Sequence, residues 1–401
     1  MQDPELPTTT TAPSLSAKER ILELEAEIAQ LKRSLDQRPP KSPTSETRLS
    51  EILYYEQPFS NARLSGLTND RDRIGSTSDF EELPKPTTNL SQLESDFMQW
   101  GYCLVENAIT KEQIQAQIDR MLDQAEAERH AGVAHMSHQG RAQLIFNMLP
   151  KGKVFRDLIA LEENAAHRAN LVEVLLEKVL GKGFYLGTAH GSIVHQGGGR
   201  QELHQDQGFV PLPHPPYPLY CLIIWCYSDF SLEEGGTYVV PGSHIDAKGN
   251  NKVRPGVAFE KMAENQLLAL TAPAGTCVLT DSRLLHSGGK RTAPGTRLAS
   301  RILYSRGMMR QQENQYLSVP REIVENVSPK LKKLMGYSSY YGLGMVDGNS
   351  IDPDQPEIHV GELSMERPHE FLQDFDWKYT KDAKMLSELD WESFAEYKGE
   401  K

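Results

Sequence analysis

The chain has 401 residues, with 43 Lys or Arg and 55 Asp or Glu, and its net charge of −12 argues against a general nucleic-acid binder, which needs a basic surface for phosphates. Apolar residues, counted with glycine and without tyrosine, make up about 42 % of the chain, which suffices for one core of about 200–300 residues. The longest apolar stretch, residues 219–227, is much shorter than the roughly 20 residues of a membrane-spanning helix, so we expect no membrane partner.

Residues 1–50 are predicted to form a disordered tail followed by one short helix. Residues 1–15 are rich in Pro, Thr and Ser and contain no apolar run typical of a secretory signal, which favours a cytoplasmic protein. Ser16 and Glu19 have the spacing of a helix-capping box. The short heptad pattern that follows is equally compatible with a helix that docks on the body and with one that forms a homodimer. Its apolar residues are Ile21, Leu24, Ile28, Leu31 and Leu35.

Residues 51–92 are polar and are predicted to be a linker or arm, whereas residues 93–345 are predicted to form the folded body. Within the body, residues 97–105 have the pattern of a helix end, a glycine stop and a short strand. Thr110, followed three residues later by a glutamine, predicts the start of a capped helix. A further helix is expected over residues 162–180.

From residue 183 onward the pattern changes to short β-favouring runs separated by Gly, Pro, Asn or Asp. Such runs with long irregular connections predict an antiparallel sandwich or jelly roll, in a mainly β fold with flanking helices (α+β). The four cysteines lack the spacing of a disulfide scaffold or a structural zinc site. A helix is expected over 321–334, and residues 346–401 are predicted to be an acidic tail. The predicted strands are residues 184–186, 191–194, 220–227, 237–240, 266–270, 276–279 and 297–304.

His204 and Asp206 are the most informative residues of the chain. In a strand, residues i and i+2 point to the same face, so an imidazole and a carboxylate converge there. One further histidine completes the set of two His and one carboxylate that non-haem Fe(II) oxygenases use. His286, in a later strand-rich segment, is the predicted third ligand, and His244, in a Pro-Gly-Ser-His turn, is the alternative. Such a set leaves iron positions open for a chelating co-substrate and dioxygen.

Arg297 follows His286 by 11 residues and opens an alternating run that is predicted to be a strand. A guanidinium at this place can hold the distal carboxylate of 2-oxoglutarate in a bidentate pair. Arg291, in a Gly/Pro-rich turn, and Arg301, with the same strand parity as Arg297, are the alternatives. His190, like His195, lies close before the metal motif and is expected to be a core residue or to line the substrate site.

With these residues the sequence resembles the phytanoyl-CoA dioxygenase family of Fe(II)/2-oxoglutarate oxygenases, whose fold is a double-stranded β-helix. The segment Gln201-Glu-Leu-His-Gln-Asp-Gln207 is similar to the family's first metal motif. The segment Glu234-Gly-Gly-Thr-Tyr-Val-Val-Pro-Gly-Ser-His244 is similar to a second motif, with Glu234 in place of the usual asparagine. The resemblance covers residues 93–345 and extends to the branch that acts on small natural products.

The resemblance implies that the His/Asp/His set binds iron, that Arg297 holds 2-oxoglutarate, and that Gln201 and Thr237 also contact 2-oxoglutarate. Fe(II), 2-oxoglutarate and O2 are therefore the expected cofactor and co-substrates. The implied reaction is the hydroxylation, desaturation or oxidative ring formation of a small metabolite, in secondary metabolism. Halogenating relatives lack the carboxylate of the metal motif, so Asp206 disfavours halogenation.

Three other functions are compatible with parts of this pattern. The first is a catalytically silent β-helix protein that binds partners through its N-terminal helix, but an intact ligand set together with Arg297 disfavours it. The second is an acyl-CoA hydroxylase, which is disfavoured because no Lys/Arg cluster near the metal motif would bind the phosphates of CoA. The third is a zinc hydrolase with the same ligands, but the chain lacks the His-Glu-x-x-His arrangement that supplies a general base.

Overall fold

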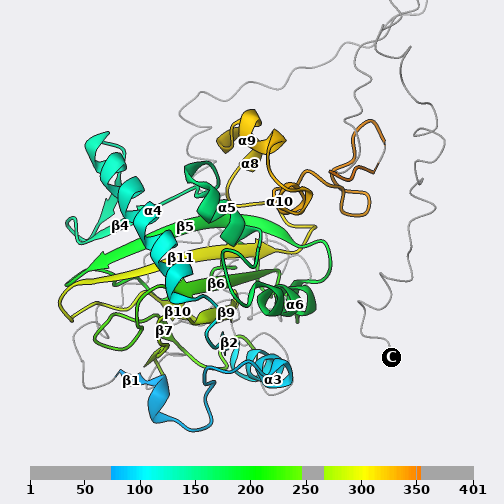
Figure 1. Cartoon of the computed structure of the whole chain (residues 1–401). Coiled ribbons are helices and arrows are strands. Elements are labelled where there is room, and N and C mark those ends of the chain that lie inside the picture. Colours follow the sequence, from blue (N-terminus) through cyan, green and yellow to red (C-terminus); the bar gives the residue numbers. More distant parts are fainter. Residues whose placement is uncertain (1–73, 246–265, 349, 354–401) are drawn as a thin grey trace, which may run out of the picture. The chain divides into compact units, whose positions relative to one another are not determined.

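The computed structural model describes residues 74–245, 266–348 and 350–353, all of which belong to one compact unit (Figure 1). The predicted tail and heptad helix within residues 1–50 lie outside the described residues. So do residues 354–401 of the predicted acidic tail. No described helix has the length and apolar character needed to cross a bilayer.

Two β-sheets form the centre of the body. All neighbouring strands run antiparallel except the parallel pair β1–β8. The larger sheet has the order β2 (Tyr102–Val105), β9 (Cys277–Asp281), β6 (Tyr220–Cys226), β11 (Thr296–Ser305), β5 (Tyr185–His195), β4 (Ala142–Ile145) and β3 (His135–Ser137). The smaller sheet has the order β1 (Gly75–Ser76), β8 (Leu268–Ala269), β7 (Tyr238–Val239) and β10 (His286–Ser287). These two sheets with their flanking helices confirm the predicted mainly β fold with a double-stranded β-helix core.

Helices cover the outer face of the larger sheet (Figure 1). Among them, α4 begins with the predicted capping box, in which Thr110 and Gln113 each accept a hydrogen bond from the other's backbone N–H, at 3.3 and 2.9 Å. The helices are α3 (Leu90–Trp100), α4 (Lys111–His130), α5 (Lys153–Ile159), α6 (Ala169–Leu180), α8 (Gln315–Ser318), α9 (Arg321–Glu325) and α10 (Pro329–Leu334), with 3-10 turns η2 (Thr77–Asp79) and η3 (Leu149–Lys151).

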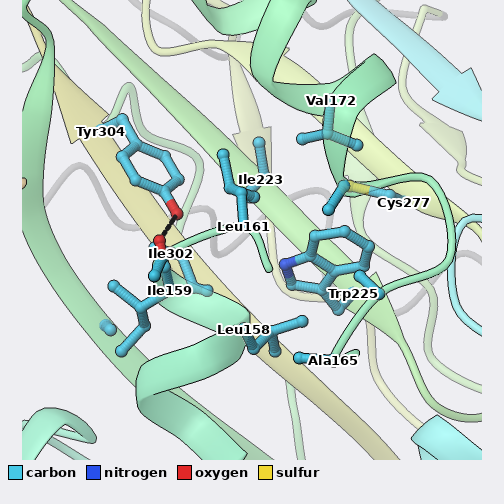
Figure 2. Packing of buried hydrophobic residues seen from close by; sticks show 14 of the residues in the cluster. Leu158, Ile159, Leu161, Ala165, Val172, Ile223, Trp225, Cys277, Ile302 and Tyr304 are labelled. Carbon is cyan, nitrogen blue, oxygen red and sulfur yellow. Dashed lines mark hydrogen bonds between the residues drawn. The ribbon is translucent and has the colours of Figure 1, made fainter. Parts of the chain in front are cut away.

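The core between the larger sheet and the helices is apolar and well filled. Trp225 of β6 and Tyr304 of β11 are fully buried there against Leu158 and Ile159 of α5 (Figure 2). The Tyr304 hydroxyl donates a hydrogen bond to the Ile159 carbonyl at 2.6 Å, so the phenol is buried without an unpaired polar group. The helices therefore pack on one face of the larger sheet, and the candidate site described below lies on its other face.

The predicted elements differ from the observed ones in three places. The strands predicted at 184–186 and 191–194 are one strand, β5, because it pairs along its whole length with β11. The helix predicted over 162–180 begins at Ala169, after turns that include a positive φ of 54° at Leu161. The helix predicted over 321–334 is divided into α9 and α10, because Pro329 has no N–H to continue a helix and opens α10 at its first turn.

Part of the predicted arm, residues 51–92, contacts the body. Ser76 pairs with Ala269 of β8, and its hydroxyl lies 2.6 Å from that of Thr271. Leu83 is buried, and α3 begins at Leu90. The described part of this segment is therefore attached to the body rather than extended in solvent. Its sequence conceals this because several of the contacts are hydroxyl or backbone contacts of polar residues.

Strand β11 has two chemically different faces. Ile302 and Tyr304 belong to the core beneath the helices, whereas Ala299 and Leu303 pack in the core between the two sheets. Because side chains alternate along a strand, Arg297 and Arg301 share the face of Ala299 and Leu303. The interior between the sheets thus receives two guanidinium groups from one strand.

Candidate metal centre

The three predicted metal ligands are brought together at the smaller sheet. His286 lies on β10, and the backbone of His204 forms an antiparallel bridge with it, with N···O distances of 2.9 and 3.0 Å. Asp206 follows two residues after His204. One ligand atom of each of the three residues lies within 4.8 Å of the others. Among the described residues, this is the one group of His, Cys, Asp and Glu side chains that could hold a metal ion.

Asp206 lies in a turn and not on the strand that the His-x-Asp spacing predicts. The chain forms a single bridge at His204 and then turns away, so strand alternation is not what places the carboxylate. Instead, the side chain of Gln205 donates a hydrogen bond to the Arg283 carbonyl, and the backbone N–H of Gln207 donates to the Ser282 carbonyl at 2.9 Å. These bonds hold the turn against the segment that leads into β10.

Hydrogen bonds to the backbone orient both imidazole rings. Nδ1 of His204 donates to the Glu202 carbonyl at 2.7 Å, and Nδ1 of His286 donates to the Leu284 carbonyl at 3.0 Å. Because a carbonyl can only accept, each Nδ1 carries a proton, so in the neutral form of each imidazole the lone pair is on Nε2. The two Nε2 atoms lie 3.7 and 3.5 Å from Oδ1 of Asp206, which is the arrangement of metal-binding imidazoles with fixed tautomers.

The electrostatics of the cluster favour an ionised carboxylate. Burial acts to raise the pKa of Asp206, but the charge and hydrogen bonds of His286 and His204 outweigh it and lower the pKa well below its usual range. Oδ2 of Asp206 is buried and has no hydrogen-bond partner among the described residues. A divalent cation between the Nε2 atoms and this carboxylate would satisfy all three donors, so the residues fit iron.

Arg297 is almost fully buried, with 1 % of its surface exposed. Its guanidinium donates a hydrogen bond to the Gly235 carbonyl and lies over the ring of Phe230, 5.0 Å from the centroid. Burial and the nearby charge of Arg301 lower the pKa of Arg297 to about 9, so the group is still a cation at neutral pH. Its Nε has no partner in the part of the molecule described, which leaves a donor for an anion.

Thr237 and Gln201 are in different situations. Thr237 is buried two residues after Gly235, and its hydroxyl has no hydrogen-bond partner among the described residues. Gln201 is exposed, and its side-chain oxygen accepts a hydrogen bond at 3.1 Å from the N–H of Gly288, two residues after His286. Thr237 thus has an unused polar group, whereas one of the two polar ends of the Gln201 amide is already used.

The alternative arginine and histidines have structural partners. Arg291 forms an ion pair with Glu234 and donates from Nε to the Gly295 carbonyl at 3.1 Å. His244 is buried, and its Nε2 donates to the Met98 carbonyl at 3.2 Å. His195 lies at the end of β5 and bonds through Nδ1 to a threonine hydroxyl at 3.0 Å. None of the three is in the cluster of potential metal ligands found among the described residues.

Arg200 is a further candidate anion-binding residue, and the sequence pattern does not reveal it. It donates a hydrogen bond at 2.8 Å to the hydroxyl of Ser287, which follows His286 on β10, and lies 5.2 Å from the ring centroid of Tyr238. A second guanidinium nitrogen, Nη2, is buried with no partner in the described structure. Its position next to Gln201 is the one signal in the sequence. The pairing of Tyr238 with Ser287, which creates the surroundings of Arg200, joins segments that are far apart in the chain.

Comparison with known proteins connects this geometry with an enzyme family. The family model described as phytanoyl-CoA dioxygenase (PhyH) matches residues 97–299. The dioxygenase swnH2 of Arthroderma benhamiae is 33 % identical over 177 residues, which are 41 % of this chain and 52 % of that protein. The alignment therefore spans about half of that relative's length.

Two further proteins are similar over a longer part of their own chains. The iron/alpha-ketoglutarate-dependent dioxygenase ausU of Aspergillus calidoustus is 23 % identical over 66 % of this chain and 84 % of its own. A crystal structure of HygX from Streptomyces hygroscopicus with nickel and 2-oxoglutarate bound is 17 % identical, with a TM-score of 0.40 over 55 % of this chain and 88 % of its own.

Proposed function

The chain belongs to the phytanoyl-CoA dioxygenase family, and on that premise we propose that it is a non-haem Fe(II)- and 2-oxoglutarate-dependent dioxygenase that oxidises a small metabolite in secondary metabolism. One observation carries the proposal. Two Nε2 atoms and one ionised carboxylate converge within 4.8 Å beside the smaller sheet, and Gly235, in the turn before β7, accepts a hydrogen bond from Arg297.

His204, Asp206 and His286 are the proposed iron ligands. Bound iron supplies the activation of O2, by which 2-oxoglutarate becomes succinate and CO2, one oxygen atom entering succinate and the other serving to oxidise the substrate C–H bond. The chain's part would be to hold the metal by these three ligand atoms and to leave its remaining positions for 2-oxoglutarate and O2. The hydrogen bonds to Glu202 and Leu284 keep both rings in that orientation.

Arg297 is the proposed anchor of the distal carboxylate of 2-oxoglutarate. Its charge is buried against Phe230, where an interaction with an anion is screened little by water. Thr237 can donate its unpaired hydroxyl to the same carboxylate, and Gln201 can donate its amide nitrogen while its oxygen stays on Gly288. Because Asp206 occupies a ligand position, the expected outcomes are hydroxylation, desaturation or ring formation.

The test is a turnover assay on anaerobically purified full-length protein supplied with Fe(II), 2-oxoglutarate and then O2. We expect succinate that depends on all three components, and no succinate from His204→Ala. Succinate formation that is unchanged in His204→Ala, or independent of iron, would contradict the proposal. Iron and 2-oxoglutarate binding without any turnover would favour the silent binding protein instead.

Two finer features belong to the same proposal. We infer a cytoplasmic enzyme, and a homodimer in which the predicted N-terminal helix associates with its copy. Sedimentation of the full chain and of a variant with Leu24 and Leu31 changed to Asp tests the dimer. A homodimer held by this helix becomes a monomer in the variant.

A further inference from the structure

We propose that Arg301 and His190 form a substrate anchor that binds an anionic oxygen, a carboxylate or an enolate, at one end of an otherwise apolar substrate. The proposal rests on the proposed function, because it names the substrate class of that same site. The two residues are directly paired across neighbouring strands, Arg301 of β11 with His190 of β5.

The anchor lies on the interior face that also carries Arg297, but at a different place. Four residues of extended strand separate the two arginines by about 13 Å, so they are placed to hold two different groups. On its other side Arg301 is paired with Ile224 of β6. Burial lowers the pKa of both Arg301 and His190 and the charge of Asp206 opposes this, so the anchor lies within electrostatic range of the metal ligands.

Neither residue has the partners that a structural role would provide. Nε of Arg301 and Nδ1 of His190 are buried without a hydrogen-bond partner in the described part of the chain. By contrast, Arg283 is buried in an ion pair with Asp281 at 2.6 Å, and Arg291 is paired with Glu234. A buried donor without an acceptor costs free energy, which a ligand oxygen would remove.

The charge state of the pair suits an anion. Burial, together with the charge of Arg301, lowers the pKa of His190 to about 4, so the imidazole is neutral at neutral pH and does not compete as a second cation. A neutral imidazole still donates through one nitrogen. The carboxylate whose charge favours the Arg301 cation is Asp206, and in an iron-loaded enzyme this carboxylate would be shared with the metal. The guanidinium of Arg301 is therefore placed to bind a further anion, and 2-oxoglutarate on Arg297 does not supply one.

The surroundings of the anchor are apolar. Ile224 and Ala299 are buried beside Arg301, and the ring of Phe146 lies 5.7 Å from that of His190 with 36 % of its surface exposed. Aromatic and aliphatic side chains around one half-buried cation favour an apolar substrate with a single anionic group over a sugar, an amine or a CoA thioester.

The experiment compares the binding of three carboxylates, benzoate, 2-naphthoate and 9-anthroate, with that of their methyl esters. Calorimetry uses the anaerobic full-length protein with Fe(II) and saturating 2-oxoglutarate. We expect at least one acid to bind about tenfold or more tightly than its ester. Arg301→Gln should remove this preference, Arg301→Lys should restore part of it, and His190→Phe should weaken it. Arg321→Gln, the same change at an exposed arginine, should retain it.

A second titration separates this proposal from the role of Arg297. Arg297→Gln should weaken 2-oxoglutarate binding, whereas Arg301→Gln should weaken only the acids. The anchor is disproved if no acid is preferred by the wild-type protein, or if Arg301→Gln keeps the preference, or if that variant loses 2-oxoglutarate instead. If the protein binds neither iron nor 2-oxoglutarate, the proposed function fails, and the acid–ester comparison on the metal-free protein still decides about the anchor. Thermal unfolding of each variant shows that it is folded.

Discussion

The backbones of His204 and His286 are joined by a reciprocal pair of hydrogen bonds, in which each N–H donates to the carbonyl of the other residue, at 2.9 and 3.0 Å. The bridge brings the two ring centroids to 4.4 Å. Each ring is then turned by its own hydrogen bond to a carbonyl two residues before it, in Glu202 and Leu284. The spacing of two ligands that are far apart in sequence is thus set by the backbone, and the position of the third is set by a turn.

Asp206→Ala should abolish both iron binding and iron-dependent succinate formation. The variant removes the anionic ligand and leaves two neutral imidazoles, so we expect the rate to fall by about 1,000-fold or more. Anaerobic calorimetry with Fe(II) and succinate analysis measure the two effects. His195→Ala is the matched control, because this histidine lies on the same segment but outside the cluster. Iron affinity that is equal in both variants would rule out the proposed ligand set.

Arg297→Lys should raise KM for 2-oxoglutarate by about tenfold to 100-fold, because an ammonium cannot form the bidentate pair with a carboxylate. The kcat at saturating 2-oxoglutarate should change much less. Steady-state succinate formation over a range of 2-oxoglutarate concentrations separates the two effects. A fall in kcat alone, with KM unchanged, would assign Arg297 a role other than binding the co-substrate.

Arg291→Gln should lower stability rather than co-substrate affinity. The change leaves Glu234 without its partner and removes bonds to the 291–295 turn, which we expect to cost about 1–3 kcal/mol in the free energy of unfolding. Urea unfolding of the variant measures the cost, and the KM for 2-oxoglutarate should stay as in the wild-type enzyme. A stable variant with a raised KM would show that Arg291 holds the co-substrate after all.

Gln205→Leu should weaken iron binding although Gln205 is not a ligand. Its side chain is buried and donates to the Arg283 carbonyl, which holds the turn that carries Asp206. Loss of such support typically weakens a metal site by about 10–100-fold. Fe(II) affinity measured by anaerobic calorimetry tests this, with Gln311→Leu as a control away from the metal ligands. Unchanged iron affinity would show that the turn keeps its shape without this bond.

His190 should make the metal-free protein less stable as the pH falls. Its pKa is lowered to about 4 in the folded chain by burial and by Arg301, against about 6.5 in the unfolded chain, so the unfolded state binds more protons between these values. The stability that is present above pH ~6.5 is lost progressively as the pH falls toward ~4, by a total on the order of 2–3 kcal/mol.

The measurement is urea unfolding of the wild-type protein and of His190→Gln at several pH values across that window. The variant lacks the imidazole, so its stability should fall less over the same range. Parallel pH profiles for the two proteins would show that His190 is protonated equally in the folded and unfolded chains.

The sequence by itself determined the chemistry of the candidate site. The identities and order of His204, Asp206, His286 and Arg297 are local facts, and the continuous apolar run of β6 and the alternating run of β11 indicate strands whichever neighbours they have. The capped start of α4 at Thr110 is likewise decided by hydrogen bonds within one turn. These features were predictable because their physical causes act over a few residues.

Only the tertiary structure decided which of the charged side chains are paired within the protein and which keep an unpaired donor. Arg291 and Arg301 are both alternatives to Arg297 in the sequence, but Glu234 neutralises the first, whereas the second is paired with His190 of β5 and has no ion-pair partner among the described residues. Asp206 reaches the two histidines from a turn held by Gln205 and not from a strand. Such differences depend on contacts between segments tens of residues apart, and a pairing of that kind is set by the packing of the whole core rather than by local propensity.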